Sequence, residues 1–348
     1  MARQCIGLDI GSTAIKLVQL RPGRTGPALE RFGVQPVPAR AIVDGTVTEP
    51  EQLAAALREL VARTAPRGRD VALAVTGNGV IIKRISVPRL EPAAFAQQVE
   101  WEARQIVAPR SLDDVFIDHT PLRQNPVTGE VEVLLVVAKK DLVGQYTKVV
   151  QDAGLRPVVV DATAFTLQNC VEASLGFTSG ETVAVVNVGA AASTICIIVE
   201  GIPTHGRDLS SGGHSYTDAL ARNLSASPEV AERIKRGQQP PPDQAVFERT
   251  MLQVSEAIAA EVLRSLDFFL GAAAEAGPAR IVLAGGSALV PSLRPALAER
   301  SRLPVTLLDP FARVQVDPKR VDLAALRTSA PVAAVAFGLA LRAEGDAP

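Results

Sequence analysis

The chain alternates short apolar runs with amphipathic segments, and this alternation predicts a series of strands and helices. Near its start, two apolar runs flank a turn of small residues, and another run follows a Pro/Gly turn. Over Glu49–Thr64 the residues Leu53, Leu57 and Leu60 recur at helical spacing, which predicts an amphipathic helix. The strands that we expect in this first block are Ile6–Ile10, Ala14–Leu20, about Leu29–Val34 and Asp70–Gly77.

Residues 78–156 read as a compact insertion of strands and helices. The helix expected over Pro92–Val107 has one apolar stripe, formed by Phe95, Val99, Ala103 and Ile106. Trp101, the only tryptophan, falls off this stripe. Two interpretations stay open for it: packing on the neighbouring sheet, or a place in a partner-binding surface.

The second half of the chain repeats the first. The stretch "VAVVNVGAAASTICIIVEG" (Val183–Gly201) has the pattern of "IGLDIGSTAIKLVQL" (Ile6–Leu20), with Asn187 in the place of Asp9. Each hairpin opens its own series of strands and helices, so we expect an α/β fold of two duplicated lobes. Both hairpin turns are expected to point into the cleft between the lobes, where small ligands commonly bind.

The residues of both turns are suited to binding an anion. Glycine and small residues let several backbone N–H groups approach one phosphate, and Gly11, Ser12 and Thr13 fit this role. Lys16 could add a positive charge, and Asp9 could hold Mg²⁺ through its water ligands. On the opposite lobe a second set of small residues comprises Gly189, Ala190 and Ser193.

Composition narrows the alternatives. The 348 residues carry a net charge of −1, which gives no reason to expect nucleic-acid binding. No apolar run approaches the roughly 20 residues that span a bilayer, and we expect no signal peptide before the first strand. Cys5, Cys170 and Cys196 lie far apart among apolar residues, so we expect buried free thiols in a cytoplasmic protein.

Five ordered motifs resemble those of the actin-like ATPase superfamily, which includes actin, sugar kinases, MreB and FtsA. They are the phosphate loop "GLDIGSTAIKLVQL", the connecting segment "VVDATAFTLQN", the second phosphate loop "VNVGAAAST", the adenosine motif "IVLAGGSALVPSL" and the second connecting helix "PVAAVAFGLAL". The resemblance implies an actin-like ATPase fold with ATP and Mg²⁺ in the cleft.

Within the superfamily, residues 78–156 are similar to the FtsA-type extra subdomain. The phrases "VEWEARQIV", "EVEVLLVVAKKDLVGQY", "AGLRPVVVDATAF" and "RSLDFF" resemble the PilM family of type IV pilus assembly proteins. This resemblance implies a cytoplasmic scaffold that is peripheral at the inner membrane through its protein partners, without membrane insertion of its own. It implies that the N-terminal tail of PilN binds in a groove beside the extra subdomain, and that other platform and motor proteins are contacted. Whether the chain forms homo-oligomers is left open.

The resemblance also divides the chain. The expected first-lobe core is 1–77 with 157–182 and 331–348, the extra subdomain is 78–156, the second-lobe core is 183–214 with 279–330, and the helical subdomain is 215–278.

Further nucleotide contacts follow from the same resemblance. Gly212 and Gly213 would approach the nucleotide at the start of the helical subdomain, and "AERIKRG" would place Glu232 on the ribose and Lys235 along the adenine. An exposed helix face is the alternative for this pair. The glycine turn after the next strand would bring backbone to the nucleotide through Gly285, Gly286 and Ser287.

Hydrolysis requires a positioned water and stabilised charge at the γ-phosphate. By resemblance, Asp161 is the water-orienting acid, and the second loop carries Asn187 where a carboxylate is usual. Because an amide is neither charged nor a base, we expect nucleotide binding with slow or absent turnover. Three alternatives stay open: an FtsA-like filament protein, the related type II secretion scaffold and, less favoured, a small-molecule kinase.

Overall fold

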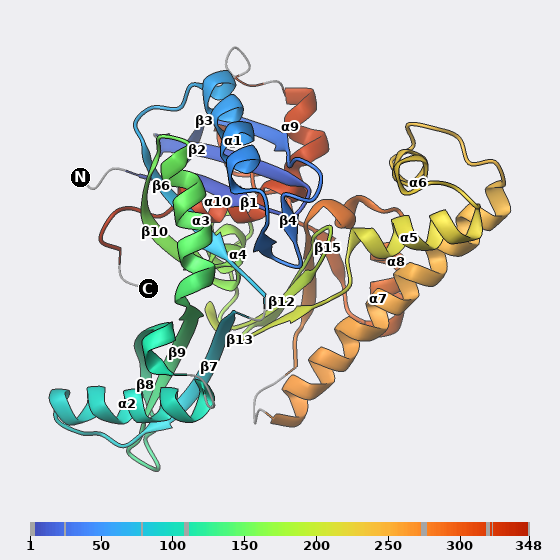
Figure 1. Cartoon of the computed structure of the whole chain (residues 1–348). Coiled ribbons are helices and arrows are strands. Elements are labelled where there is room, and N and C mark those ends of the chain that lie inside the picture. Colours follow the sequence, from blue (N-terminus) through green and yellow to red (C-terminus); the bar gives the residue numbers. More distant parts are fainter. Residues whose placement is uncertain are drawn as a thin grey trace.

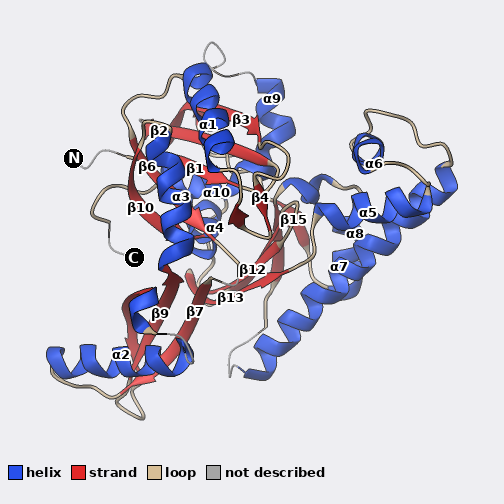
Figure 2. Ribbon diagram, in the orientation of Figure 1, coloured by secondary structure: helices blue, strands red, loops and turns tan. Residues whose placement is uncertain are grey.

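The computed structural model describes residues 4–23, 26–77, 79–107, 111–272, 277–317, 321 and 323–346. Two lobes, each built on a mixed β-sheet, lie against each other, and a smaller unit of three strands and a helix projects from them (Figure 1). Helices cover the sheets of both lobes (Figure 2).

The sheet of the first lobe has the strand order β10-β6-β1-β2-β3-β16. Its strands are β1 (Ile6–Ile10), β2 (Ala14–Pro22), β3 (Pro27–Pro36), β6 (Asp70–Val75), β10 (Arg156–Ala162) and β16 (Gln315–Val316). The first three form the expected antiparallel meander, and β6 and β10 continue the sheet in parallel beyond β1. The other elements of this lobe are α1 (Pro50–Thr64), α3 (Lys140–Asp152), α9 (Leu323–Ser329) and the small hairpin of β4 (Ile42–Val43) and β5 (Thr46–Val47).

The sheet of the second lobe, in the order β13-β12-β11-β14-β15, repeats this pairing. Its strands are β11 (Thr182–Val188), β12 (Ser193–Val199), β13 (Ile202–Leu209), β14 (Arg280–Ala284) and β15 (Val305–Leu307). Again three antiparallel strands are followed by two parallel ones. The duplication predicted from the two hairpins is therefore present in the topology of both sheets.

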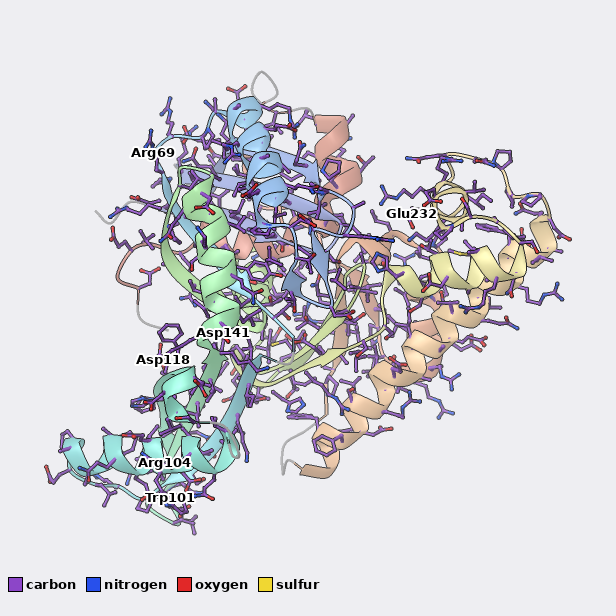
Figure 3. The ribbon with its side chains drawn as sticks, in the orientation of Figure 1. Arg69, Trp101, Arg104, Asp118, Asp141 and Glu232 are labelled. Carbon is purple, nitrogen blue, oxygen red and sulfur yellow. The ribbon has the colours of Figure 1, made fainter. Side chains whose placement is uncertain are left out.

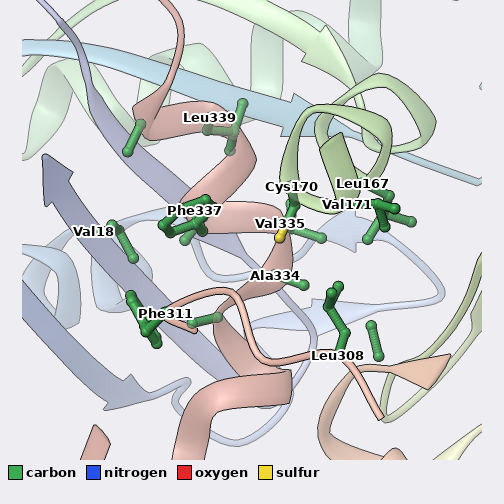
Figure 4. Close-up of a cluster of buried hydrophobic side chains, with 14 of the residues drawn as sticks. Val18, Leu167, Cys170, Val171, Leu308, Phe311, Ala334, Val335, Phe337 and Leu339 are labelled. Atoms are coloured by element: carbon green, nitrogen blue, oxygen red, sulfur yellow. The ribbon is translucent and has the colours of Figure 1, made fainter. Parts of the chain in front are cut away.

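Two helices join the lobes, α4 (Thr163–Ser174) and α10 (Ala334–Ala340). They pack closely on each other because glycine allows it: a Cβ on Gly338 would lie 1.9 Å from the carbonyl oxygen of Thr166. Around them is the largest hydrophobic cluster, with Phe337 and Cys170 fully buried at its centre (Figure 4). All three cysteines are buried free thiols, as expected.

The projecting unit is a sheet in the order β7-β9-β8 with one helix on its outer face. Its elements are β7 (Val80–Val87), α2 (Pro92–Val107), a 3₁₀ turn (Leu112–Asp114), β8 (Val115–Gln124) and β9 (Val131–Lys139). The sequence pattern also assigns α3 to this unit, but the buried side chains Tyr146, Val149 and Val150 of α3 lie in the core of the first lobe with α1. Amphipathicity identifies the buried face of a helix but not the surface that covers it.

The helical subdomain consists of α5 (Gly213–Asn223), α6 (Pro228–Lys235) and the long α7 (Gln244–Ala272), and α8 (Leu293–Ser301) packs against α7. The proline-containing segment 236–243 is a loop between α6 and α7, because its prolines forbid a continuous helix. Among the described residues, no helix combines the length and apolar character needed to cross a membrane.

Candidate functional site

The first hairpin turn joins β1 to β2, and a hydrogen bond of 3.1 Å from the Gly11 amide to the Ala14 carbonyl closes it. Asp9 and Lys16 lie opposite each other on the two strands. Their side chains form an ion pair with 3.0 Å between Lys16 Nζ and Asp9 Oδ2, and both are largely buried. Lys16 Nζ also lies over Gly11, since a Cβ built there would be 2.8 Å away.

The second hairpin has the same turn geometry. The Gly189 amide donates to the Ala192 carbonyl over 3.0 Å, and Asn187 lies opposite Thr194 in the positions of Asp9 and Lys16. Within the described part of the chain, the backbone amides at the tips of both turns donate no hydrogen bond; they belong to Ser12, Thr13, Ala190 and Ala191. Each hairpin therefore presents a pair of free N–H groups of the kind that binds phosphate oxygens.

The other predicted residues of the second lobe gather behind its hairpin. The amide of Gly213 donates to the Gly189 carbonyl over 2.9 Å, and the hydroxyl of Ser287 donates to the same carbonyl over 2.9 Å. Gly285 has a φ of +92°, and a Cβ there would lie 2.4 Å from the Val188 carbonyl oxygen and 2.8 Å from Asn187 Oδ1. Only glycine fits this contact, which keeps the turn against Asn187.

Glu232 and Lys235 form a hydrogen-bonded cluster at the start of α5. Lys235 Nζ lies 2.6 Å from Glu232 Oε2 and donates to the carbonyl of Gly213 and the hydroxyl of Thr217. Burial opposes ionisation of Glu232, but hydrogen bonds from Lys235 and Thr217 outweigh it and lower the pKa of Glu232 to about 2. Burial lowers the pKa of Lys235. Both groups are thus held in place beside the second hairpin, and Figure 3 shows Glu232 on α6.

Asp161 lies at the end of β10, two strands from β1 and Asp9 in the sheet of the first lobe. Its carboxylate is 2.8 Å from Nε of Arg342, which follows α10, and it also accepts from the amide of Ala162. Burial raises the pKa of Asp161, and Arg342 opposes that shift. In this geometry the acid predicted to orient water is one half of a buried ion pair.

A cavity of about 450 Å³ lies where the two lobes and the projecting unit meet. Its walls come from the end of β6, the start of β7, the start of α4 and strand β13. Apolar side chains such as Val80 and Ile82 line one side, and Arg207 and Asp208 line the other. Among the described strands, β7 and β13 are edge strands of their sheets, and they pack beside each other here.

Trp101 lies away from this cavity. Trp101 is 53% exposed and does not belong to the described cluster that joins α2 to the sheet, so the interpretation that it packs on that sheet is wrong. Figure 3 shows it on the side of α2 that faces away from the lobes, and it is absent from the walls of the cavity. Of the predicted stripe on the opposite face, Val99 and Ala103 are buried, and Phe95 and Ile106 are half-buried against the same cluster. A place for Trp101 in a partner-binding surface stays a prediction, and that surface is not the cavity.

Sequence reasoning missed Asp208. Its carboxylate accepts hydrogen bonds from the Gly77 amide over 2.6 Å and from the hydroxyls of Thr194 and Thr76 over 2.6 and 3.1 Å. No motif surrounds it, and its partners on the first lobe are more than 130 positions away. A signal was available only in the strand register, which places Asp208 directly opposite Thr194.

Two similar sheets with matched hairpin turns, joined by two packed helices, define the actin-like ATPase fold. The chain belongs to the family described as type IV pilus assembly protein PilM, which matches residues 7–344. The actin-like fold and the kinship to FtsA that the motifs implied are thereby confirmed.

Solved structures agree with this assignment. A structure described as the PilM-PilN type IV pilus biogenesis complex is similar with a TM-score of 0.85 and 29% identity, covering 98% of this chain and 99% of that one. MreB5 of Spiroplasma citri bound to AMPPNP shares the fold, with a TM-score of 0.51 and 11% identity over 97% of this chain and 95% of that one.

The cell division protein FtsA of Bacillus subtilis (strain 168) is 24% identical over 257 residues, 66% of this chain and 57% of FtsA. The match thus spans little more than half the length of FtsA.

Proposed function

We propose that this chain is a nucleotide-binding scaffold of the type IV pilus machinery, which holds the N-terminal tail of PilN and hydrolyses ATP slowly or not at all. The observation that carries the proposal is the cavity between the projecting unit and the lobes, in a chain of the PilM family. In this role the protein stays in the cytoplasm and reaches the inner membrane and the pilus motors through partners.

The nucleotide part rests on the two hairpins. Free amides on both turns, at Ser12 and Thr13 and at Ala190 and Ala191, can bind phosphate oxygens from opposite sides. Lys16 is close enough to the first turn to contact phosphate, and Asp9 provides the oxygen ligand that Mg²⁺ prefers through water. Bound Mg²⁺ would supply positive charge that offsets the charge of the phosphates. The MreB5 structure, which shares this fold and is bound to AMPPNP, supports the proposal of a nucleotide ligand.

The second lobe would hold the remainder of the nucleotide. Gly212, Gly213 and Gly285 keep backbone close to the hairpin, and the position that a Cβ of Gly286 would occupy is open. Glu232 remains ionised at neutral pH because its pKa is about 2, so its carboxylate can accept hydrogen bonds from ribose hydroxyls. Lys235 then lies along the base.

Slow ATP turnover is expected because neither Asn187 nor Asp161 offers a free carboxylate to the attacking water. Asn187 supplies no charge to the attacking water, and Arg342 holds the carboxylate of Asp161. Asp9, the residue predicted to hold Mg²⁺, pairs with Lys16, whose Nζ lies over the first turn. Binding needs donors, which are present, whereas hydrolysis needs a base or a charge at the water.

The peptide part rests on the two strand edges in the cavity. An extended peptide can add backbone hydrogen bonds to an exposed edge and place alternate side chains in pockets. Here β7 and β13 both offer such edges, and Val80, Ile82 and Ala164 give the cavity an apolar side. Gly206 on β13 opens the space, because a Cβ there would lie 3.3 Å from Ile82.

The experiment places a large side chain in the cavity by substituting Gly206, one of its wall residues. We expect Gly206→Leu to weaken binding of a fluorescent synthetic peptide with the N-terminal segment of PilN by about tenfold or more, in line with overpacking of a fitted site. Gly144→Leu is the matched control, because Gly144 lies on α3 with open space around it. Equal affinity of Gly206→Leu and the wild type, measured by fluorescence anisotropy, would place the peptide elsewhere.

A further inference from the structure

Asp208 connects the two lobes. Through Thr194 it is bound to β12 of its own lobe, and through Thr76 and the Gly77 amide it is bound to the end of β6 in the first lobe. The Gly77 bond is short, 2.6 Å, and a charged acceptor makes such bonds about twice as strong as neutral ones. In the described part of the chain the charge of Asp208 is held by these donors and not by an ion pair.

The strand register connects Asp208 to the second phosphate turn. Asn187, Thr194 and Asp208 lie directly opposite one another on β11, β12 and β13, so their side chains share one face of the sheet. That face is directed at the first lobe, since Val185 and Cys196 on it belong to the cluster around α4 and α10. Asn187, Thr194 and Asp208 thus form a row across three strands. At a strand spacing of about 4.8 Å, this row spans roughly 10 Å from Asn187 to Asp208.

The other end of the row reaches the cavity. Thr76, Gly77 and Asp208 are themselves wall residues, and β7 begins only three residues after Gly77. Gly77 has a φ of +89°, a conformation that suits glycine, and the Val80 amide donates back to its carbonyl over 3.0 Å. A shift of Gly77 therefore moves the start of β7, one of the two strand edges that line the cavity.

We infer that Asp208 is the positioning residue that couples the occupancy of the second phosphate turn to the shape of the peptide cavity. When a nucleotide changes the position of β11 and β12 relative to the first lobe, the bonds of Asp208 transmit the change to Gly77 and β7. The inference rests on the proposed function, because it needs both ligands. A hydrogen-bonded link between two elements that each contact one ligand is the kind of contact that carries coupling energy.

Thermodynamics supplies a measurable quantity. If the nucleotide changes the Kd of the peptide by a factor, the peptide must change the Kd of the nucleotide by the same factor. Typical factors are about 5 to 150. We expect the coupling factor of the wild type to fall in this range. In Asp208→Asn the peptide Kd with nucleotide should lie within about twofold of the Kd without it, whatever the peptide affinity of the variant. Without peptide, Asp208→Asn should bind MgATP as the wild type does.

The experiment measures the Kd of the fluorescent PilN N-terminal peptide with and without saturating Mg-AMPPNP. Thr194→Val and Thr194→Ser form a matched pair that decides the matter even if Asp208→Asn fails to fold. Valine keeps the volume but removes the hydroxyl that donates to Asp208, and serine keeps the hydroxyl. We expect Thr194→Val to lose the coupling factor and Thr194→Ser to retain it. Asp118→Asn, an exposed carboxylate on β8, is the surface control.

The outcomes separate the two proposals. If the peptide or the nucleotide does not bind the wild type, the proposed function fails. If both bind but the factor is one in the wild type, or if Thr194→Val retains the wild-type factor, the coupling role of Asp208 is overturned while the scaffold function stands.

Discussion

The two hairpins are alike in backbone and different in charge. Both close with a glycine amide donating to a carbonyl three residues on, and at both tips two amides donate no hydrogen bond to any described residue. The first hairpin carries Asp9 opposite Lys16, whereas the second carries Asn187 opposite Thr194. In the second lobe the carboxylate is two strands further on, at Asp208, where it binds the opposite lobe.

This difference separates two tasks that a duplicated fold could share. The backbone of both turns is retained, and with it the capacity to bind phosphate. The charge that would assist hydrolysis is missing from the second turn, and a carboxylate in the same row of the sheet instead holds the lobes together. We therefore expect changes at Asn187 to affect turnover and changes at Asp208 to affect communication between sites.

The largest effect is expected on the stability of the fold, when the buried ion pair of Asp161 with Arg342 is broken. If Asp161 is structural, Arg342→Met leaves a buried carboxylate without its ion pair, and the free energy of unfolding should fall by about 3–5 kcal/mol. Urea unfolding followed by circular dichroism measures this. Lys148→Met, which breaks an exposed pair with Asp152 on α3, should change the value by less than about 1 kcal/mol. If Arg342→Met lowers the free energy of unfolding as little as Lys148→Met does, the carboxylate of Asp161 does not depend on Arg342 and is available for another role.

The missing charge can be restored by Asn187→Asp. Aspartate has the size of asparagine, so the variant should fold, and single-turnover ATP hydrolysis should accelerate roughly tenfold to a hundredfold. Asn187→Ala removes the amide without adding charge and should not accelerate hydrolysis. An unchanged rate in Asn187→Asp would show that the difference between the hairpins does not limit turnover.

The glycines of the turns provide a matched comparison. A Cβ on Gly189 would lie 2.8 Å from the backbone oxygen of Ala192, whereas one on Gly11 would lie 2.8 Å from the end of the Lys16 side chain. Because a side chain moves more easily than backbone, Gly189→Ala should lower the free energy of unfolding by about 1–3 kcal/mol and Gly11→Ala by less than about 1. Gly11→Ala should instead weaken MgATP binding by displacing Lys16. The reverse order in thermal and urea unfolding would contradict the contacts described for the two turns.

The smallest effect concerns pH. The pKa of Glu232 is about 2 in the folded state, below its ordinary value of 4.5, so its stabilising contribution is present above pH 4.5 and is lost as the pH falls toward 2. Between pH 5 and pH 3.5 the wild type should lose about 1 kcal/mol more than Glu232→Gln. Parallel loss in both proteins would mean that Glu232 is not held by Lys235 and Thr217.

Much of the fold could be predicted from the sequence. The alternation of apolar residues located the three strands of the first meander and the hairpin of the second, and the repeated Gly-small-small turn revealed the duplication. The third strand of the second meander, β13, was not predicted. The partners of Asp161 and Asp208 could not be predicted, because Arg342 and Gly77 are joined to them only by the folded topology. The same limit explains α3 and Trp101: a pattern shows which face of a helix is apolar, but not which neighbour covers it.

The central claim is that both hairpin turns hold one nucleotide, and its most direct test is the titration of the wild-type protein with a fluorescent ATP analogue in Mg²⁺. We predict saturable binding of one analogue per chain that unlabelled ATP displaces. No saturable binding, or binding that ATP fails to displace, would contradict the account.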